Sequence, residues 1–218
     1  LVKSVLEQNR KNKKEWSIVF LMLLVAAYLL NPRGWEPVAD TFKMWFASRL
    51  LTERFEFPLF SHGPLYVLYL SLFRLLEYPL SFFAEYSVTH LFCYFSIYLL
   101  LRRRLAPVLS FLLVVAWIPF LATVEGTHVH FGMGFISLYL RRLYDSNKQG
   151  EWVPLSLACA ALSHPVYSTF LVGHVIGILG LKWLFRNKKP ILYERLHIQK
   201  PWGSTLSLAK FFLLVLTF

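Results

Sequence analysis

The sequence predicts an all-α protein, a polytopic bundle of transmembrane helices. Of the 218 residues, 56% are hydrophobic and only 16% are charged, and the mean hydropathy is +0.50. Soluble domains usually carry about 25% charged residues. The apolar residues form successive long runs, which is typical of a membrane protein with about six to seven spans and interfacial amphipathic helices in its first external loop.

The basic residues are the second observation behind this prediction. The formal net charge of +11 could indicate a nucleic-acid ligand, but the Lys and Arg residues stand in short runs beside apolar segments. That placement is the one that orients membrane helices. We therefore expect no nucleic-acid partner. Cys93 and Cys159 lie within apolar runs and indicate neither a disulfide framework nor a metal knuckle.

The first part of the chain is expected to contain one span and two helices lying on the membrane surface. Residues 3–15 read as a basic tail and residues 16–30 as the first span. Residues 41–52 have the spacing of an amphipathic helix, which Phe57-Pro58 should end. Residues 65–76 follow the turn His62-Gly63-Pro64-Leu65-Tyr66. They are too short for a span and are interrupted by Arg74.

Later apolar runs predict the remaining spans, at residues 81–101, 105–124, 126–140, 152–163 and 166–185, with a last one beginning at 204. The chain stops inside an apolar run, so residues 1–218 are expected to be a single transmembrane domain, C-terminally truncated from something longer. Because Arg102-Arg103-Arg104 and Arg141-Arg142 follow alternate spans, the positive-inside rule predicts a cytoplasmic N-terminus and an extracytoplasmic active site.

With this topology, most of the candidate chemistry falls at one face of the membrane. Asp40 lies at an apolar boundary, where it could act as a base toward an uncharged hydroxyl or simply cap the helix that follows. Glu125, His128 and His130 could hold a divalent metal, manganese or magnesium, or form only a polar helix entrance. His164-Pro165 is expected to break a helix beside a cavity.

Other polar residues within the runs have structural interpretations. His90 and His174 should form hydrogen bonds inside the bundle, and Gly132 and Gly134 should allow close helix packing. Glu77 and Glu85 flank Pro79 and are expected to pair with Arg74. The sequence has no Gly-rich phosphate loop, Gly-x-Ser-x-Gly elbow or His-Glu-x-x-His, so ATP-driven chemistry is not expected.

The order of a basic tail, a span, Asp40, an amphipathic helix and the turn from His62 to Tyr66 resembles the GT-C superfamily of membrane glycosyltransferases. The protein O-mannosyltransferase and aminoarabinose transferase branch is the most similar in layout. The chain departs from that pattern at Gly63, where relatives have proline, and in lacking a second acid after Asp40.

The resemblance implies transfer of a sugar from a polyprenyl-phosphate-linked donor to an acceptor hydroxyl on a protein, glycan or lipid. Asp40 would be the general base, and His62 with Arg33 or Arg54 would neutralise the lipid phosphate. Residues 65–76, from the turn at Tyr66 onward, would line a groove for the polyprenyl chain. Glu125, His128, His130 and His164 would support the site or hold the metal, and the lipid bilayer would be a further partner.

Two other function classes stay open on the sequence alone. The chain could be a non-catalytic membrane subunit or transporter-like bundle, although it has no repeated halves. It could also be an intramembrane metal-dependent hydrolase, an interpretation that rests only on Glu125, His128 and His130.

Overall fold

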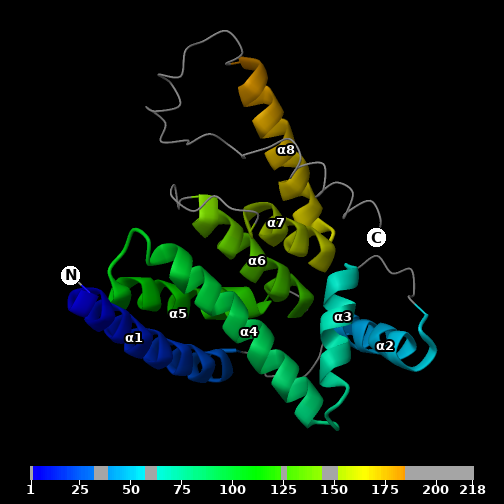
Figure 1. Ribbon diagram of the computed structural model, residues 1–218. Helices are drawn as coiled ribbons and strands as arrows, with labels where there is room; N and C mark the ends of the chain where they lie inside the picture. The colour runs from blue at the N-terminus through cyan, green and yellow to red at the C-terminus, as the bar shows by residue number, and fades with distance from the viewer. Residues whose placement is uncertain (1, 32–38, 57–62, 124–126, 144–151, 185–218) are drawn as a thin grey trace.

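The computed structural model describes residues 2–31, 39–56, 63–123, 127–143 and 152–184, and all regular structure in these ranges is helical (Figure 1). The helices follow one another along the chain as α1 (Val2–Leu29), α2 (Ala39–Arg54), α3 (Pro64–Phe73), α4 (Leu80–Leu101), α5 (Pro107–Thr123), α6 (Thr127–Leu143), α7 (Trp152–Ser163) and α8 (Val166–Leu184).

The prediction of a polytopic transmembrane bundle is wrong. Among the helices in the described ranges, none combines the length and the apolar character that a bilayer crossing requires. A crossing takes about 20 apolar residues. Helices α3, α5, α6 and α7 have 10, 17, 17 and 12 residues, and α4, with 22, buries polar groups that include Glu85, Thr89 and His90.

The same finding removes the predicted localisation. Because the described ranges contain no candidate span, the basic runs beside these helices have no membrane helix to orient, and neither a cytoplasmic N-terminus nor an extracytoplasmic active site follows from them. The positions of the helices were nevertheless predicted closely from the apolar runs. Helix α7 has the expected bounds, and α4 and α8 differ from the predicted segments by one residue. The basic tail, expected to precede the first helix, is part of α1. The run expected from residue 204 lies outside the described residues.

Helix α4 is central because it packs against α1, α5 and α6 (Figure 1). One buried cluster joins α1, α4 and α5 through residues such as Leu23, Tyr94 and Ile118. A second cluster joins α6, α7 and α8 through residues such as Tyr139 and Leu157. Close approach of α6 depends on its glycines, as predicted, because a Cβ on Gly132 would meet the ring of Tyr167 and one on Gly134 the ring of Phe92.

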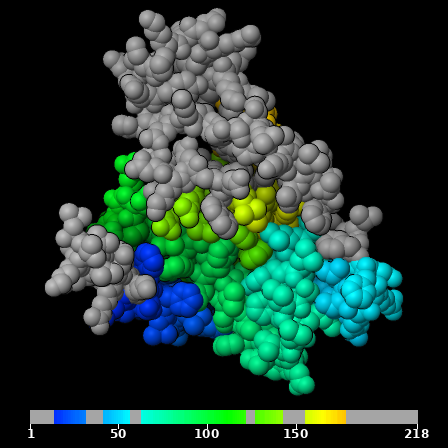
Figure 2. Space-filling view, viewed as in Figure 1, coloured from blue at the N-terminus to red at the C-terminus, as the bar shows by residue number. Residues whose placement is uncertain are grey.

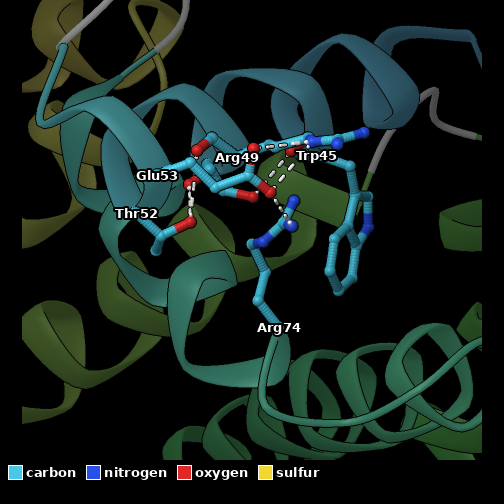
Figure 3. A network of polar contacts seen from close by, with 6 residues as sticks. Trp45, Arg49, Thr52, Glu53 and Arg74 are labelled. Carbon is cyan, nitrogen blue, oxygen red and sulfur yellow. Dashed lines mark hydrogen bonds and ion pairs between the residues drawn. The ribbon is translucent and has the colours of Figure 1, made fainter.

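Helices α2 and α3 form a separate pair beside this core. Met44, Tyr66 and Leu70 are buried in their shared cluster. At the outer end of the pair, Glu53 accepts a hydrogen bond from Arg49 Nε at 3.0 Å and one from Arg74 Nη2 at 3.1 Å (Figure 3). The Arg74–Glu53 ion pair therefore links the C-terminal ends of α2 and α3.

Polar contacts attach α1 to α4 at both ends. The hydroxyl of Tyr86 donates to the carbonyl of Ala27 at 2.9 Å, and the hydroxyls of Tyr28 and Ser87 lie 2.5 Å apart. At the other end, Arg102 donates to Glu15 at 3.1 Å. These contacts fix the position of α4 relative to α1, so α4 presents its polar face to α3 and α6.

Candidate active site

The carboxyl group of Glu85 lies at the centre of a buried polar network between α3, α4 and α6. Glu85 is only 2% exposed. Its Oε1 accepts hydrogen bonds from the hydroxyl of Tyr66 at 2.5 Å and from that of Thr89 at 2.9 Å. The hydroxyl of Thr127 contacts that of Tyr66 and also bonds to the carboxyl group. We refer to Tyr66, Glu85, Thr89 and Thr127 as the Glu85 centre.

Burial changes the acidity of this centre. Removal of the carboxyl group from water raises the pKa of Glu85 to about 7, although the hydrogen bonds from the hydroxyls act in the opposite direction. Burial and the neighbouring Glu85 raise the pKa of Tyr66 well above its ordinary value, so this phenol keeps its proton and acts as a donor. Glu85 can therefore gain or lose a proton near neutral pH, as a general acid or base must.

Three helix N-termini meet beside the Glu85 centre. Helix α6 begins at Thr127, and α3 begins at Pro64, two residues before Tyr66. Helix α8 joins them because the hydroxyl of Tyr167 donates to the carbonyl of Val129 at 2.7 Å. Each N-terminus carries a partial positive charge from its helix dipole, although the first N–H groups of α8 already form hydrogen bonds to His164 and Pro165. The region therefore favours a negatively charged group.

The meeting of these helices depends on a glycine. A Cβ on Gly63, the residue that precedes α3, would lie 1.9 Å from the carbonyl oxygen of Leu162 in α7. Only a residue without a side chain fits so close to backbone, so Gly63 allows the start of α3 to reach the end of α7.

Two histidines lie between the Glu85 centre and the surface. His128 is buried, with its ring 5.8 Å from that of Tyr66, and it stacks on the half-buried His164 at 4.9 Å. The backbone N–H of Val166 donates to Nδ1 of His164 at 3.1 Å. This bond leaves Nδ1 unprotonated, so the neutral ring of His164 carries its proton on Nε2.

A further histidine pair lies deeper, between α4 and α6. His90 and His130 have ring centroids 4.4 Å apart. Nδ1 of His90 donates to the carbonyl of Tyr86 at 2.9 Å, since that oxygen can only accept. Burial, together with the nearby His130, lowers the pKa of His90 well below its ordinary value. The prediction that His90 and His174 form hydrogen bonds inside the bundle is confirmed, because His174 also bonds to the hydroxyl of Tyr139.

The predicted site residues are only partly placed by the structure. Tyr66, His128 and His164 come together beside the Glu85 centre, and His130 lies against His90 between α4 and α6. Arg54 is exposed at the end of α2. Asp40 is the second residue of α2, but its side chain lies outside the described residues, as do Arg33, His62 and Glu125.

Of the three residues that could hold a metal, the structure describes His128 and His130, and Glu125 lies outside the described residues. Within them, no group of three or more His, Cys, Asp or Glu side chains is arranged to hold a metal ion. Two histidines spaced two residues apart on a helix point to different faces. Accordingly, His128 faces Tyr66 and His164, whereas His130 faces His90.

Glu85 itself was not among the predicted site residues. It was expected to pair with Arg74, but Arg74 pairs with Glu53. The available signal was an acid inside an apolar run with a threonine four residues later, Glu85 and Thr89, which share one face of a helix. The hydroxyl of Tyr66 comes from another helix, so spacing along α4 could not reveal it.

Comparison with known proteins assigns no relatives to this arrangement: no family model, curated protein or solved structure matches the chain.

Proposed function

We propose that the chain is a glycosyltransferase that moves a sugar from a polyprenyl-phosphate-linked donor to an acceptor hydroxyl, with Glu85 as the proton acceptor. The observation that carries the proposal is the Glu85 centre, a buried carboxyl group with a pKa of about 7 beside converging helix N-termini. This centre replaces Asp40 as the base.

Glu85 supplies the acid–base part of the reaction. In the proposed step the acceptor oxygen bonds to the anomeric carbon while the bond from that carbon to the phosphate oxygen breaks. The acceptor proton passes to the Glu85 carboxylate through the hydroxyls of Thr127 and Tyr66, which are hydrogen-bonded to it. Positioned proton transfer of this kind contributes about 10²- to 10⁴-fold to a rate.

The helix ends supply the electrostatic part. The leaving phosphate takes the electron pair of the broken bond and becomes more negative, and positive helix N-termini stabilise such charge. Thr127 and His164 are the partly exposed residues around the centre, so the substrates would approach from their side. His128 and His164 would then lie next to the phosphate.

The proposal is tested with purified full chain, polyprenyl-phosphate mannose and glucose labelled in the sugar, and Ser/Thr peptides or oligosaccharides as acceptors. We expect Glu85→Gln to lower the transfer rate at least about 100-fold. Glu77→Gln is the matched control, because Glu77 is an exposed carboxylate only eight residues away and should leave the rate unchanged. Circular dichroism establishes that both variants are folded.

The assay also separates Glu85 from Asp40. If Asp40→Asn abolishes transfer and Glu85→Gln does not, the base is assigned to the wrong residue. Absence of transfer by the wild-type chain with every donor and acceptor pair would overturn the proposed function as a whole.

A further inference from the structure

Helix α5 has its apolar and polar sides reversed relative to a helix that faces water. Its one serine, Ser110, is fully buried and donates to the carbonyl of Ala106 at 3.0 Å. A helix on the surface of a globular protein normally turns its apolar stripe to the core and its polar side chains outward.

The outward face of α5 is apolar along its length. Six exposed residues recur at the three- and four-residue spacings of one helix face, and none carries a charge or a hydroxyl: Leu109, Leu112, Leu113, Ala116, Trp117 and Phe120. Trp117 is 60% exposed and Phe120 73%. We call these six residues the α5 face.

Helix α1 extends this surface. It packs beside α5 in the same buried cluster. Between Trp16 and Leu29, α1 buries small or medium residues such as Ala27 and exposes Ile18, Leu21 and Leu29 at 60%, 62% and 77%. The described side chains of α1, in blue, lie on the surface at the lower left of the view in Figure 2. Contiguous apolar surface of this kind marks a binding site, since monomeric soluble proteins rarely expose more than a few hundred Å² of it.

The chemistry of the surface favours lipid over protein. Protein interfaces have a polar rim and about one hydrogen bond per 100–200 Å², whereas the indole N–H of Trp117 is the one side-chain group on the α5 face that can form a hydrogen bond. Exposed Arg103 and Arg104 lie just before α5, and cations beside an apolar helix face are typical of binding to anionic lipid. The chain as a whole is also positive, with a formal net charge of +11, which is the sign that an anionic surface attracts.

We infer that the α5 face, with the adjoining face of α1, binds the surface of an anionic lipid bilayer. With 17 residues, α5 is about 25 Å long. It lies along the bilayer surface, with its apolar side chains among the acyl chains and the arginines at the headgroups. This inference does not depend on the proposed function, because its readout is binding.

The test is flotation of the full chain with vesicles of phosphatidylcholine, alone or mixed with phosphatidylglycerol. We expect binding to the mixed vesicles, and we expect Leu112→Gln/Trp117→Gln/Phe120→Gln to weaken it at least about tenfold. The matched control is Phe170→Gln/Val172→Gln/Ile176→Gln on α8, which changes three similarly exposed apolar residues and should retain binding.

The contribution of the Arg103 and Arg104 charges to vesicle binding is tested separately. Arg103→Gln/Arg104→Gln should reduce binding to the mixed vesicles and its dependence on salt, and should leave binding to pure phosphatidylcholine unchanged. The inference is overturned if the wild-type chain does not float with either vesicle, or if the two triple variants lose binding equally. It is also overturned if light scattering shows a dimer that the α5 substitutions dissociate, because a second copy would then cover the face.

Discussion

The hydroxyl of Tyr66 lies 2.5 Å from Oε1 of Glu85, and both residues are almost fully buried. A phenol that keeps its proton thus donates to a carboxyl group whose own pKa is about 7. The pair joins α3 to α4 and supplies a group that changes charge at neutral pH.

We expect the transfer rate to rise with pH and to reach half of its plateau near pH 7, because Glu85 must be ionised to accept a proton. Replacing Tyr66 with Phe removes a hydrogen bond that favours the carboxylate, so the pKa of Glu85 should rise and the midpoint should move to higher pH. The measurement is the rate of sugar transfer between about pH 5.5 and about pH 9, a range that brackets the expected midpoint of about 7. A midpoint that stays in place or falls in the Tyr66→Phe variant would contradict the assigned hydrogen bond.

The buried carboxyl group should also affect stability. Because the folded protein holds the Glu85 proton up to about pH 7 and the unfolded chain releases it near 4.5, stability from this group is highest at low pH and is lost as pH rises between these values. The loss is about 3 kcal/mol in the free energy of unfolding. Glu85→Gln should remove this pH-dependent loss. The variant should therefore gain stability relative to wild type as pH rises.

Chemical unfolding of wild type and Glu85→Gln at pH 5 and pH 8, about two units below and one unit above the Glu85 pKa of about 7, measures this difference. The comparison must be between the two proteins at each pH, because His90, whose pKa is lowered by burial, destabilises the fold as pH falls in both. An equal pH dependence in the two proteins would show that Glu85 keeps an ordinary pKa.

Gly63→Ala should destabilise the protein strongly. The added Cβ would lie 1.9 Å from the carbonyl oxygen of Leu162, so the start of α3 must move away from α7. We expect a loss of about 2–4 kcal/mol in the free energy of unfolding. Gly177→Ala in α8 is the control: a Cβ there meets nothing within 4 Å, and alanine should be neutral or stabilise the helix by up to about 1 kcal/mol. Thermal unfolding of both variants distinguishes close packing from a general effect of replacing glycine.

The Arg74–Glu53 ion pair should contribute little to the free energy of unfolding. Both side chains are partly exposed, and pairs of this kind typically contribute about 0.2–1 kcal/mol. A double-mutant cycle with Arg74→Met and Glu53→Gln should give a coupling energy in this range. The same cycle with Glu77, the partner expected from the sequence, should give none.

The sequence was informative about helices because apolar runs, prolines and glycines act locally. The pair His164-Pro165 led to the correct end of α7, and Pro58 led to an end of α2 that was predicted two residues too early. The same runs led to the wrong fold class, because hydrophobicity alone does not show whether a helix faces lipid or other helices. The predicted spans included Glu85 and His90, and the structure buries these residues against other helices.

The site could be predicted only in part: the turn from His62 to Tyr66 drew attention to Tyr66, and His128 and His164 were also candidates. The hydrogen bond to Glu85 crosses from α3 to α4, and the stacking of His128 on His164 crosses from α6 to the start of α8. Such contacts depend on how helices dock. A single sequence contains no direct signal for docking, and Glu85 was therefore assigned to an ion pair that does not form.

The wide separation of Tyr66 and His164 along the chain has a consequence for biosynthesis. Nearly one hundred residues must emerge after Tyr66 before His164 can stack on His128 and Leu162 can meet Gly63. Until then, the stacked histidine pair and the contact between the start of α3 and the end of α7 are not yet formed. The site is therefore completed late in synthesis, and a ribosome-bound intermediate that ends before α7 should be inactive.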